Sequence, residues 1–240
     1  MTVREIVETL GLAADEDAVR RMAEYNAMVI AMSRKMNLTG IKDAEESLVK
    51  NIYDSLTVYE EKYFPKNGRM LDLGTGAGFP GIPLAILRPD MQIVLVDSVL
   101  KKLVFIENAA AKLGIKNIKI LHIRAEEGGR RRKTRETFDM VTARAVKMLP
   151  VIAEWGIPFV KEGGIFAAMK GPGADEELRQ SGKILKELKA EMEKCAEQME
   201  YEQAAIWRDR IRNVERVIQR QKAAETNLSE RDVLAIKRLE

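Results

Sequence analysis

The stretch that most constrains this chain is residues 70–81, where a short apolar run meets a turn rich in glycine. It reads Met70-Leu71-Asp72-Leu73-Gly74-Thr75-Gly76-Ala77-Gly78-Phe79-Pro80-Gly81, and an apolar segment over 82–87 follows. Glycine reaches positive φ and carries no Cβ, so the backbone N–H groups of such a turn can approach a ligand closely. The stretch predicts a strand, a tight turn and the start of a helix, with a ligand site at the turn.

Two overlapping glycine spacings indicate different ligands. Gly76-x-Gly78-x-x-Gly81 is the spacing of dinucleotide-binding turns, which leaves a nicotinamide-dependent oxidoreductase as an alternative. In Gly74-x-Gly76-x-Gly78, Asp72 precedes the turn, and an acid there favours a cationic ligand with an ammonium group, such as S-adenosylmethionine (SAM). Asp97 ends the next apolar run about 20 residues on, where a carboxylate contacts ribose hydroxyls. The preferred cofactor is therefore SAM.

The hydrophobic pattern changes near residue 69. Residues 1–60 show helical spacing and predict a helical cap, with helices over about 18–36 and 44–58. Further on, predicted strands cover 69–73, 92–97, 117–122, 138–142 and 163–170, and predicted helices cover 80–87, 99–113 and 148–155. This alternation predicts a Rossmann-like α/β fold with a doubly wound, mostly parallel sheet.

Ligands in such sheets bind beyond the carboxyl ends of the strands. The glycine turn, Asp97, Ala125-Glu126 and Arg144 all fall at those ends in this layout. Their convergence is stronger evidence for a site than any one of them. A polar group on a predicted helix, comprising Lys50, Asn51, Asp54 and Ser55, could face either solvent or the cleft.

Charge permits nucleic-acid binding but does not require it, because the net charge is +3. A basic cluster is either a solvated loop or a contact for RNA phosphates; it comprises Arg130, Arg131, Arg132 and Lys133, with Arg135 close by. Lys170 closes the last predicted strand and is a second candidate for RNA contact. Arg144 could contact the cofactor or an RNA phosphate.

Residues for other chemistry are scarce. The chain has one histidine, His122, expected to be a packed or semi-buried strand residue and not a base, and one cysteine, Cys195, on a predicted apolar helix stripe. They cannot form a zinc cage or an internal disulfide, so we expect no metal. The scarcity of proton-handling residues is informative if the reaction is methyl transfer, because an acceptor such as guanine N7 attacks through a lone pair and needs alignment but no general base. No signal core or membrane-length run is present, so we expect a cytoplasmic protein.

The pattern changes again after Gly171-Pro172-Gly173. Apolar stripes over 185–199 and 204–218 predict an antiparallel helical hairpin, followed by a charged tail. The predicted organisation is a helical cap over 1–60, a SAM-binding Rossmann-like domain over 61–180, and the hairpin with its tail over 181–240.

Residues 20–171 resemble the bacterial small-subunit ribosomal RNA methyltransferase G family, also called glucose-inhibited division protein B. The matching runs are Lys35-Met36-Asn37-Leu38-Thr39, Asp54-Ser55-Leu56, Asp72 to Ala85 with its Gly-Phe-Pro-Gly-Ile-Pro extension, Asp97-Ser98, Lys101-Lys102, Ala125-Glu126, Ala143-Arg144-Ala145-Val146 and Lys170-Gly171. The resemblance implies a class I SAM-dependent methyltransferase acting on N7 of one guanine in 16S ribosomal RNA, with the small ribosomal subunit as partner. It also implies SAM contacts from Gly74, Phe79, Ala125, Glu126 and Arg144.

The chain departs from that family in three places. Asn51 stands where the family usually has histidine, and Met32-Ser33 stands where a Trp-Asn pair is common before the Asn-Leu-Thr run. The further strands that complete the family's sheet are expected to be missing after Gly171. From about Leu185 the chain instead resembles the UVR motif, a helical hairpin of the excision-repair proteins UvrB and UvrC, with Met192 to Ile211 as the matching run. This second resemblance implies a protein partner for residues 185–220, and a non-catalytic interaction protein is a further alternative.

Overall fold

The computed structural model describes residues 1–144 and 148–169, the backbone of 233–237, and scattered residues between 189 and 208. One six-stranded sheet has the order β3-β2-β1-β4-β5-β6. The strands are β1 (Arg69–Leu73), β2 (Gln92–Asp97), β3 (Ile118–His122), β4 (Phe138–Arg144), β5 (Val160–Met169) and β6 (Val233–Lys237). Neighbouring strands are parallel from β3 to β5, and β6 is antiparallel to β5.

The helices precede the sheet or connect its strands. They are α1 (Val3–Thr9), α2 (Glu16–Ser33), α3 (Ala44–Ser47), α4 (Asp54–Thr57), α5 (Gly81–Leu87), α6 (Leu100–Lys112), α7 (Ala125–Gly128) and α8 (Leu149–Gly156), with a π-helix η1 (Leu48–Tyr53) and 3-10 helices η2 (Glu61–Tyr63) and η3 (Ile157–Phe159). The long helix α2 begins where Asp15 accepts a hydrogen bond of 2.7 Å from the backbone N–H of Ala18. Such a cap satisfies one of the open N–H groups at a helix start.

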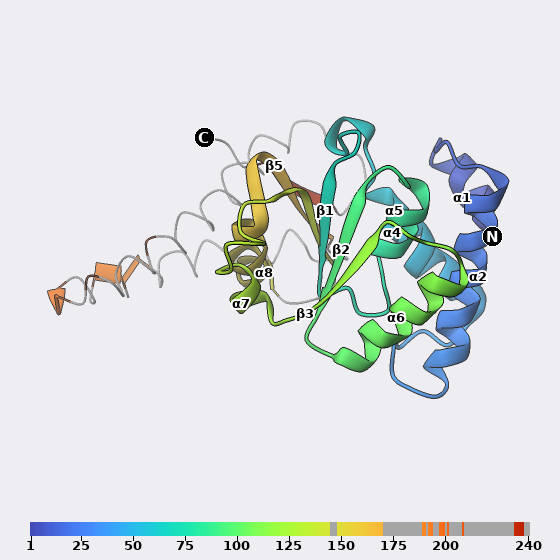
Figure 1. Cartoon of the computed structure of the whole chain (residues 1–240), viewed down its shortest axis with the longest axis horizontal. Helices are drawn as coiled ribbons and strands as arrows, with labels where there is room; N and C mark the ends of the chain where they lie inside the picture. The colour runs from blue at the N-terminus through green and yellow to red at the C-terminus, as the bar shows by residue number, and fades with distance from the viewer. Residues whose placement is uncertain are drawn as a thin grey trace.

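Helices cover both faces of the sheet, as Figure 1 shows, with α1, α2, α5 and α6 on one side and α7 and α8 on the other. Two apolar clusters fill the layers between helices and sheet. Successive side chains of β1 alternate between them, because Met70 belongs to the first cluster and Leu71 to the second. The predicted α/β architecture with a mostly parallel sheet is thus what the described residues form.

The N-terminal helices share a core with the sheet. Ile6 of α1 and Met22 and Val29 of α2 belong to the same buried cluster as Met70 of β1 and Ile106 of α6. Residues 1–33 therefore pack directly on the layer that carries the glycine turn. Within the described residues, no helix combines the length and the apolar character that crossing a membrane requires.

The expected loss of the terminal strands is wrong at one point, because β6 pairs with β5 along its length, from Ile165 opposite Lys237 to Met169 opposite Val233. The edge of β5 is therefore paired with a strand of the same chain and is not left open to other chains. The sequence predicts a charged tail here, in which Asn227-Leu228-Ser229 could cap a final short helix; residues 233–237 instead form a strand. The helical hairpin expected over 185–220 lies outside the described residues.

Candidate cofactor site

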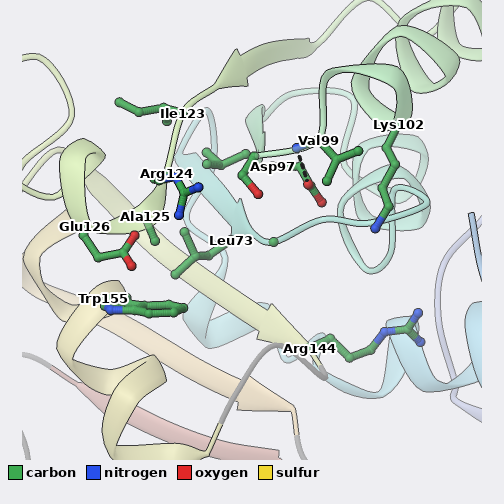
Figure 2. A pocket seen from close by; sticks show the side chains of 13 residues that line it. Leu73, Asp97, Val99, Lys102, Ile123, Arg124, Ala125, Glu126, Arg144 and Trp155 are labelled. Atoms are coloured by element: carbon green, nitrogen blue, oxygen red, sulfur yellow. Dashed lines mark hydrogen bonds between the residues drawn. The ribbon is translucent and has the colours of Figure 1, made fainter.

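A cleft of about 340 Å³ opens at the carboxyl ends of β1, β2, β3 and β4, the edge at which the sequence predicts a ligand. Figure 2 shows the side chains around it. The residues that line it are Leu73, Gly74, Val96, Asp97, Ser98, Val99, Lys102, Ile123, Arg124, Ala125, Glu126, Arg144 and Trp155. Five of the eight residues predicted to hold the cofactor are in this set: Gly74, Asp97, Ala125, Glu126 and Arg144.

The glycine turn has the backbone that only glycine adopts readily. Gly74, Gly76 and Gly78 have φ angles of 68°, 59° and 87°. Gly74 lines the cleft, whereas Gly76 and Gly78 do not. The N–H of Gly76 donates to Asp97 Oδ2 at 3.0 Å, and a Cβ at Gly78 would collide with the Tyr25 hydroxyl. The predicted turn is confirmed. Gly76 and Gly78 do not contact the cleft, but Gly76 holds Asp97 in place and Gly78 leaves room for Tyr25.

Asp97 ends β2 and connects the glycine turn to the start of α6. Its Oδ1 accepts from the backbone N–H of Val99 at 2.8 Å, the dashed line in Figure 2, and its Oδ2 accepts from Gly76. The residue is 7% exposed, and the exposed part faces the cleft. A carboxylate fixed by two backbone N–H groups keeps its orientation when a hydroxyl ligand approaches its remaining lone pairs.

Asp72 has a different role from the expected contact with a ligand ammonium. It is fully buried and does not line the cleft. Its Oδ2 accepts from Thr75 Oγ1 at 2.6 Å and from Gly81 N at 3.0 Å, and its Oδ1 accepts from Thr142 Oγ1 at 3.0 Å. Burial raises the pKa of Asp72, and these hydrogen bonds oppose the rise. Asp72 fixes the turn to α5 and β4, because its side chain points into the layer beneath α5.

The dinucleotide spacing also has a packing explanation. A Cβ at Gly81 would collide with Leu95 and would lie 2.8 Å from Asp72 Oδ2, so the start of α5 can sit this close to the sheet only as glycine. Phe79 is 3% exposed and does not line the cleft. Its ring lies 5.7 Å from that of Tyr25 and 5.5 Å from the Arg144 guanidinium carbon. The structure therefore places Phe79 as a support for Arg144.

Arg144 ends β4 and joins the cleft to the polar group of the N-terminal region. Its Nη1 donates to the Lys50 carbonyl oxygen at 2.6 Å and to Asp54 Oδ2 at 2.8 Å, and its Nη2 donates to Asn51 Oδ1 at 3.1 Å. Ser55 is buried and donates to the carbonyl oxygen of Asn51. Two side chains of the predicted polar group, Asn51 and Asp54, thus hold a cation of the cleft, whereas the Lys50 side chain pairs with Glu46.

The wall opposite Asp97 combines Ala125 and Glu126, at the start of α7, with Trp155 of α8. Figure 2 shows the indole of Trp155 below Ala125 and Glu126. Sequence reasoning missed Trp155, which lies near the C-terminal end of α8, where no local pattern marks a ligand contact. Arg124 and Lys102 complete the cations of the cleft.

The remaining predicted residues lie elsewhere. The loop after α7 carries the four predicted RNA-binding cations, all exposed: Arg130, Arg131, Arg132 and Lys133. One of them, Arg131, has its Nη2 3.9 Å from Glu127 Oε2. Lys170 and Cys195 lie outside the described residues. His122 is the last residue of β3, so its place in a strand is confirmed, but it is exposed, so the expected packed or semi-buried environment is wrong. Its Nε2 lies 3.0 Å from the Ser98 carbonyl oxygen.

Comparisons with known proteins agree on one family. The model of the family described as rRNA small subunit methyltransferase G matches residues 18–206, which extends beyond Gly171, where the resemblance ended. The ribosomal RNA small subunit methyltransferase G of Clostridium perfringens is 39% identical over 179 residues, covering 75% of each chain. That of a Thermoanaerobacter species is 42% identical over 179 residues, again covering 75% of each chain.

A solved SAM-dependent O-methyltransferase from Thermotoga maritima aligns with a TM-score of 0.44 and 17% identity, covering 62% of this chain and 52% of that one. The matches in sequence leave no place for the oxidoreductase alternative. This chain belongs to the rRNA small subunit methyltransferase G family of SAM-dependent enzymes.

Proposed function

We propose that this chain transfers a methyl group from SAM to N7 of a guanine in the 16S ribosomal RNA of the small subunit, and that SAM binds in the cleft above β1 and β2. The observation that carries the proposal is the position of Asp97. Its carboxylate lies in the cleft wall, held by the glycine turn on one side and the start of α6 on the other.

The chemistry of the cleft suits SAM. Apolar residues from strands, helices and the loops between them offer surfaces for the adenine ring; they are Leu73, Val99, Ile123, Ala125 and Trp155. Asp97 is the acceptor for ribose hydroxyls, and Gly74 brings bare backbone to the same wall. Arg144 and Lys102 are cations that can pair with the carboxylate of the amino-acid part.

Catalysis in this account depends on alignment. Bound SAM supplies a methyl group on a positively charged sulfur atom. The chain holds SAM through Asp97, Glu126 and Arg144, and it holds the RNA so that the guanine N7 lone pair faces the methyl group. Placing two reactants in line lowers the barrier without a proton transfer, so the site needs no general base.

The basic loop is the proposed RNA contact. Its cations, Arg130, Arg131, Arg132 and Lys133, are exposed and follow α7, whose first residues line the cleft. Phosphate contacts of this kind position RNA without reading its sequence, and they weaken as salt rises. Lys170 remains a predicted RNA contact as well. A ribosomal RNA substrate also supports a cytoplasmic location for this protein.

A transfer experiment tests the proposal. The full chain is incubated with tritiated SAM and small subunits from a strain that lacks this methylation, and labelled RNA is cleaved chemically at 7-methylguanine. We expect label at one guanine. The Asp97→Asn variant should lose about tenfold or more in SAM affinity by calorimetry, whereas Asp90→Asn, a carboxylate outside the cleft, should not.

Two outcomes would contradict the proposal. Wild-type protein that binds no SAM removes the cofactor assignment, and label found away from guanine N7 removes the acceptor assignment.

The UVR-like hairpin over 185–220 and its protein partner stay predictions. A pull-down with the full chain, compared with a chain that ends at residue 184, tests the partner.

A further inference from the structure

Three acceptors from one helical turn hold the Arg144 guanidinium. They are the Lys50 carbonyl oxygen, Asp54 Oδ2 and Asn51 Oδ1, at 2.6, 2.8 and 3.1 Å. The Arg144 side chain is 18% exposed and that of Asp54 is 46% exposed. Arg144 lines the cleft, whereas Asp54 does not. Asp54 is therefore a carboxylate outside the cleft that contacts a cation lining it.

The backbone of this segment is shaped to present these acceptors. Residues 48–53 form the π-helix η1. The N–H of Asp54 donates to the carbonyl oxygens of Val49 and Asn51 and not to that of Lys50, its α-helical partner. The Lys50 carbonyl oxygen accepts from Arg144. Single π-turns inside helices occur frequently at functional sites.

A chain of hydrogen bonds fixes the Asn51 amide. Its Nδ2 donates to Ser47 Oγ at 2.9 Å, and Ser47 Oγ donates to Asn26 Oδ1 of α2 at 2.6 Å. Asn51, Ser47 and Asn26 are all buried. The acceptor oxygen of Asn51 is thereby held toward Arg144, and the guanidinium has little freedom to leave the Asp54 carboxylate.

The charges of the cleft explain why a carboxylate behind Arg144 matters. Among the described residues that line the cleft, Lys102, Arg124 and Arg144 are cationic, and Asp97 and Glu126 are anionic. SAM carries a sulfonium, an ammonium and a carboxylate, so it has a net positive charge. Its product, S-adenosylhomocysteine, has a neutral thioether in place of the sulfonium. Cations in the wall therefore oppose the donor more than the product.

We propose that Asp54 is a specificity-determining residue that offsets the charge of Arg144, so that the cleft favours the cationic donor over the neutral product. The inference rests on the proposed binding of SAM in this cleft. Arg144 can then donate hydrogen bonds to the amino-acid part of the ligand without adding a full unbalanced charge beside the sulfonium. Asp54 acts through Arg144 and through the local potential and does not itself line the cleft.

The test compares the affinities of the two ligands. Calorimetry gives the dissociation constants of SAM and S-adenosylhomocysteine for the wild type and for Asp54→Asn, which keeps an oxygen acceptor for Arg144 and removes the charge. We expect the SAM affinity to fall by about 3- to 10-fold relative to that of S-adenosylhomocysteine. The difference should shrink at high salt, because Asp54 is partly exposed.

Matched variants separate charge from structure. Glu46→Gln removes a carboxylate from the same helical segment, one that pairs with Lys50 and does not touch Arg144, and should leave the ratio unchanged. Asp54→Glu restores the charge and should restore the ratio. If Asp54→Asn does not fold, Asp54→Gln removes the same charge and keeps an oxygen acceptor, and the ratio should fall in the same way.

Equal losses for both ligands in Asp54→Asn would assign Asp54 a purely structural role and overturn the inference. A ratio that shifts toward SAM in Asp54→Asn would overturn it as well. Wild-type protein that binds neither ligand contradicts the proposed function itself. A wild type that binds both, together with an unaltered ratio in Asp54→Asn, removes only the inference about Asp54.

Discussion

The Tyr25 hydroxyl of α2 donates a hydrogen bond of 2.8 Å to the carbonyl oxygen of Ala77, in the middle of the glycine turn. Tyr25 is fully buried, and burial raises its pKa well above the ordinary value, so the hydroxyl remains a donor at any working pH. The N-terminal helices thus fix the loop that shapes the cofactor site.

Removing this hydrogen bond should destabilise the protein. Tyr25→Phe leaves the Ala77 carbonyl oxygen without its buried donor, which costs about 1–3 kcal/mol. Urea unfolding measures the loss, and SAM affinity should fall with it, because the turn loses its anchor. Tyr59→Phe is the matched control, since the Tyr59 hydroxyl accepts from Arg88 at 3.4 Å, away from the cleft. A SAM affinity that is the same in Tyr25→Phe and the wild type would contradict the anchoring role.

Gly78→Ala should lower the free energy of unfolding by more than Gly163→Ala, an alanine substitution at another glycine with positive φ. Gly78 has φ of +87° and its Cβ would collide with the Tyr25 hydroxyl, whereas Gly163 has φ of +73° and open space around it. Gly163→Ala measures the backbone strain alone, about 1 kcal/mol. Gly78→Ala should exceed it in urea unfolding, and part of the excess should vanish in a Tyr25→Phe background. Equal costs at the two glycines would refute the collision.

The pair of Arg88 and Asp90 predicts a pH dependence of stability. Hydrogen bonds from Arg88 lower the pKa of Asp90 to about 2, below the ordinary 3.8. Because the folded pKa is the lower one, the contribution is fully present above about pH 4 and is lost as pH falls through about 2. In urea unfolding, the free energy of unfolding of the wild type should exceed that of Asp90→Asn by about 1 kcal/mol at pH 6, and the difference should shrink steadily as pH falls from 4 through 2. A constant difference across this range would contradict the assignment.

Trp155 should report ligand binding by its fluorescence. The chain has two tryptophans, so Trp207→Phe leaves Trp155 as the only one. Its indole lines the cleft, and S-adenosylhomocysteine should change its emission with saturation at the affinity found by calorimetry. A Trp155→Leu variant should bind more weakly, because a flat apolar surface for the adenine is lost. Emission that stays constant through saturation would place the ligand elsewhere.

The sequence predicted the parts of the fold whose signal is local. β1 and β2 have the expected bounds, because central parallel strands are apolar runs that end at an acid or a glycine turn. The role of Asp72 could not be predicted, since a strand residue can point to either face and only the packed structure shows that it faces α5. The contact of Arg144 with Asp54 joins residues 90 apart in sequence, and no local pattern encodes it.

The strand β6 was missed for a related reason. Its apolar run over 233–236 is short and stands within a charged region, so only pairing with β5 identifies it as part of the sheet. Trp155 was missed because a single aromatic residue on an amphipathic helix is ordinarily a core residue. The sequence does not show that α8 brings Trp155 to the cleft, and the structure does.

The central claim is that SAM lies in the cleft at the carboxyl ends of β1 and β2. A crystal structure of the full chain with S-adenosylhomocysteine tests it most directly. The account predicts the ribose at Asp97, the adenine beside Ala125 and Trp155, and the amino-acid part toward Arg144. Ligand density at another site, or a cleft closed by side chains while the ligand is bound, would contradict it.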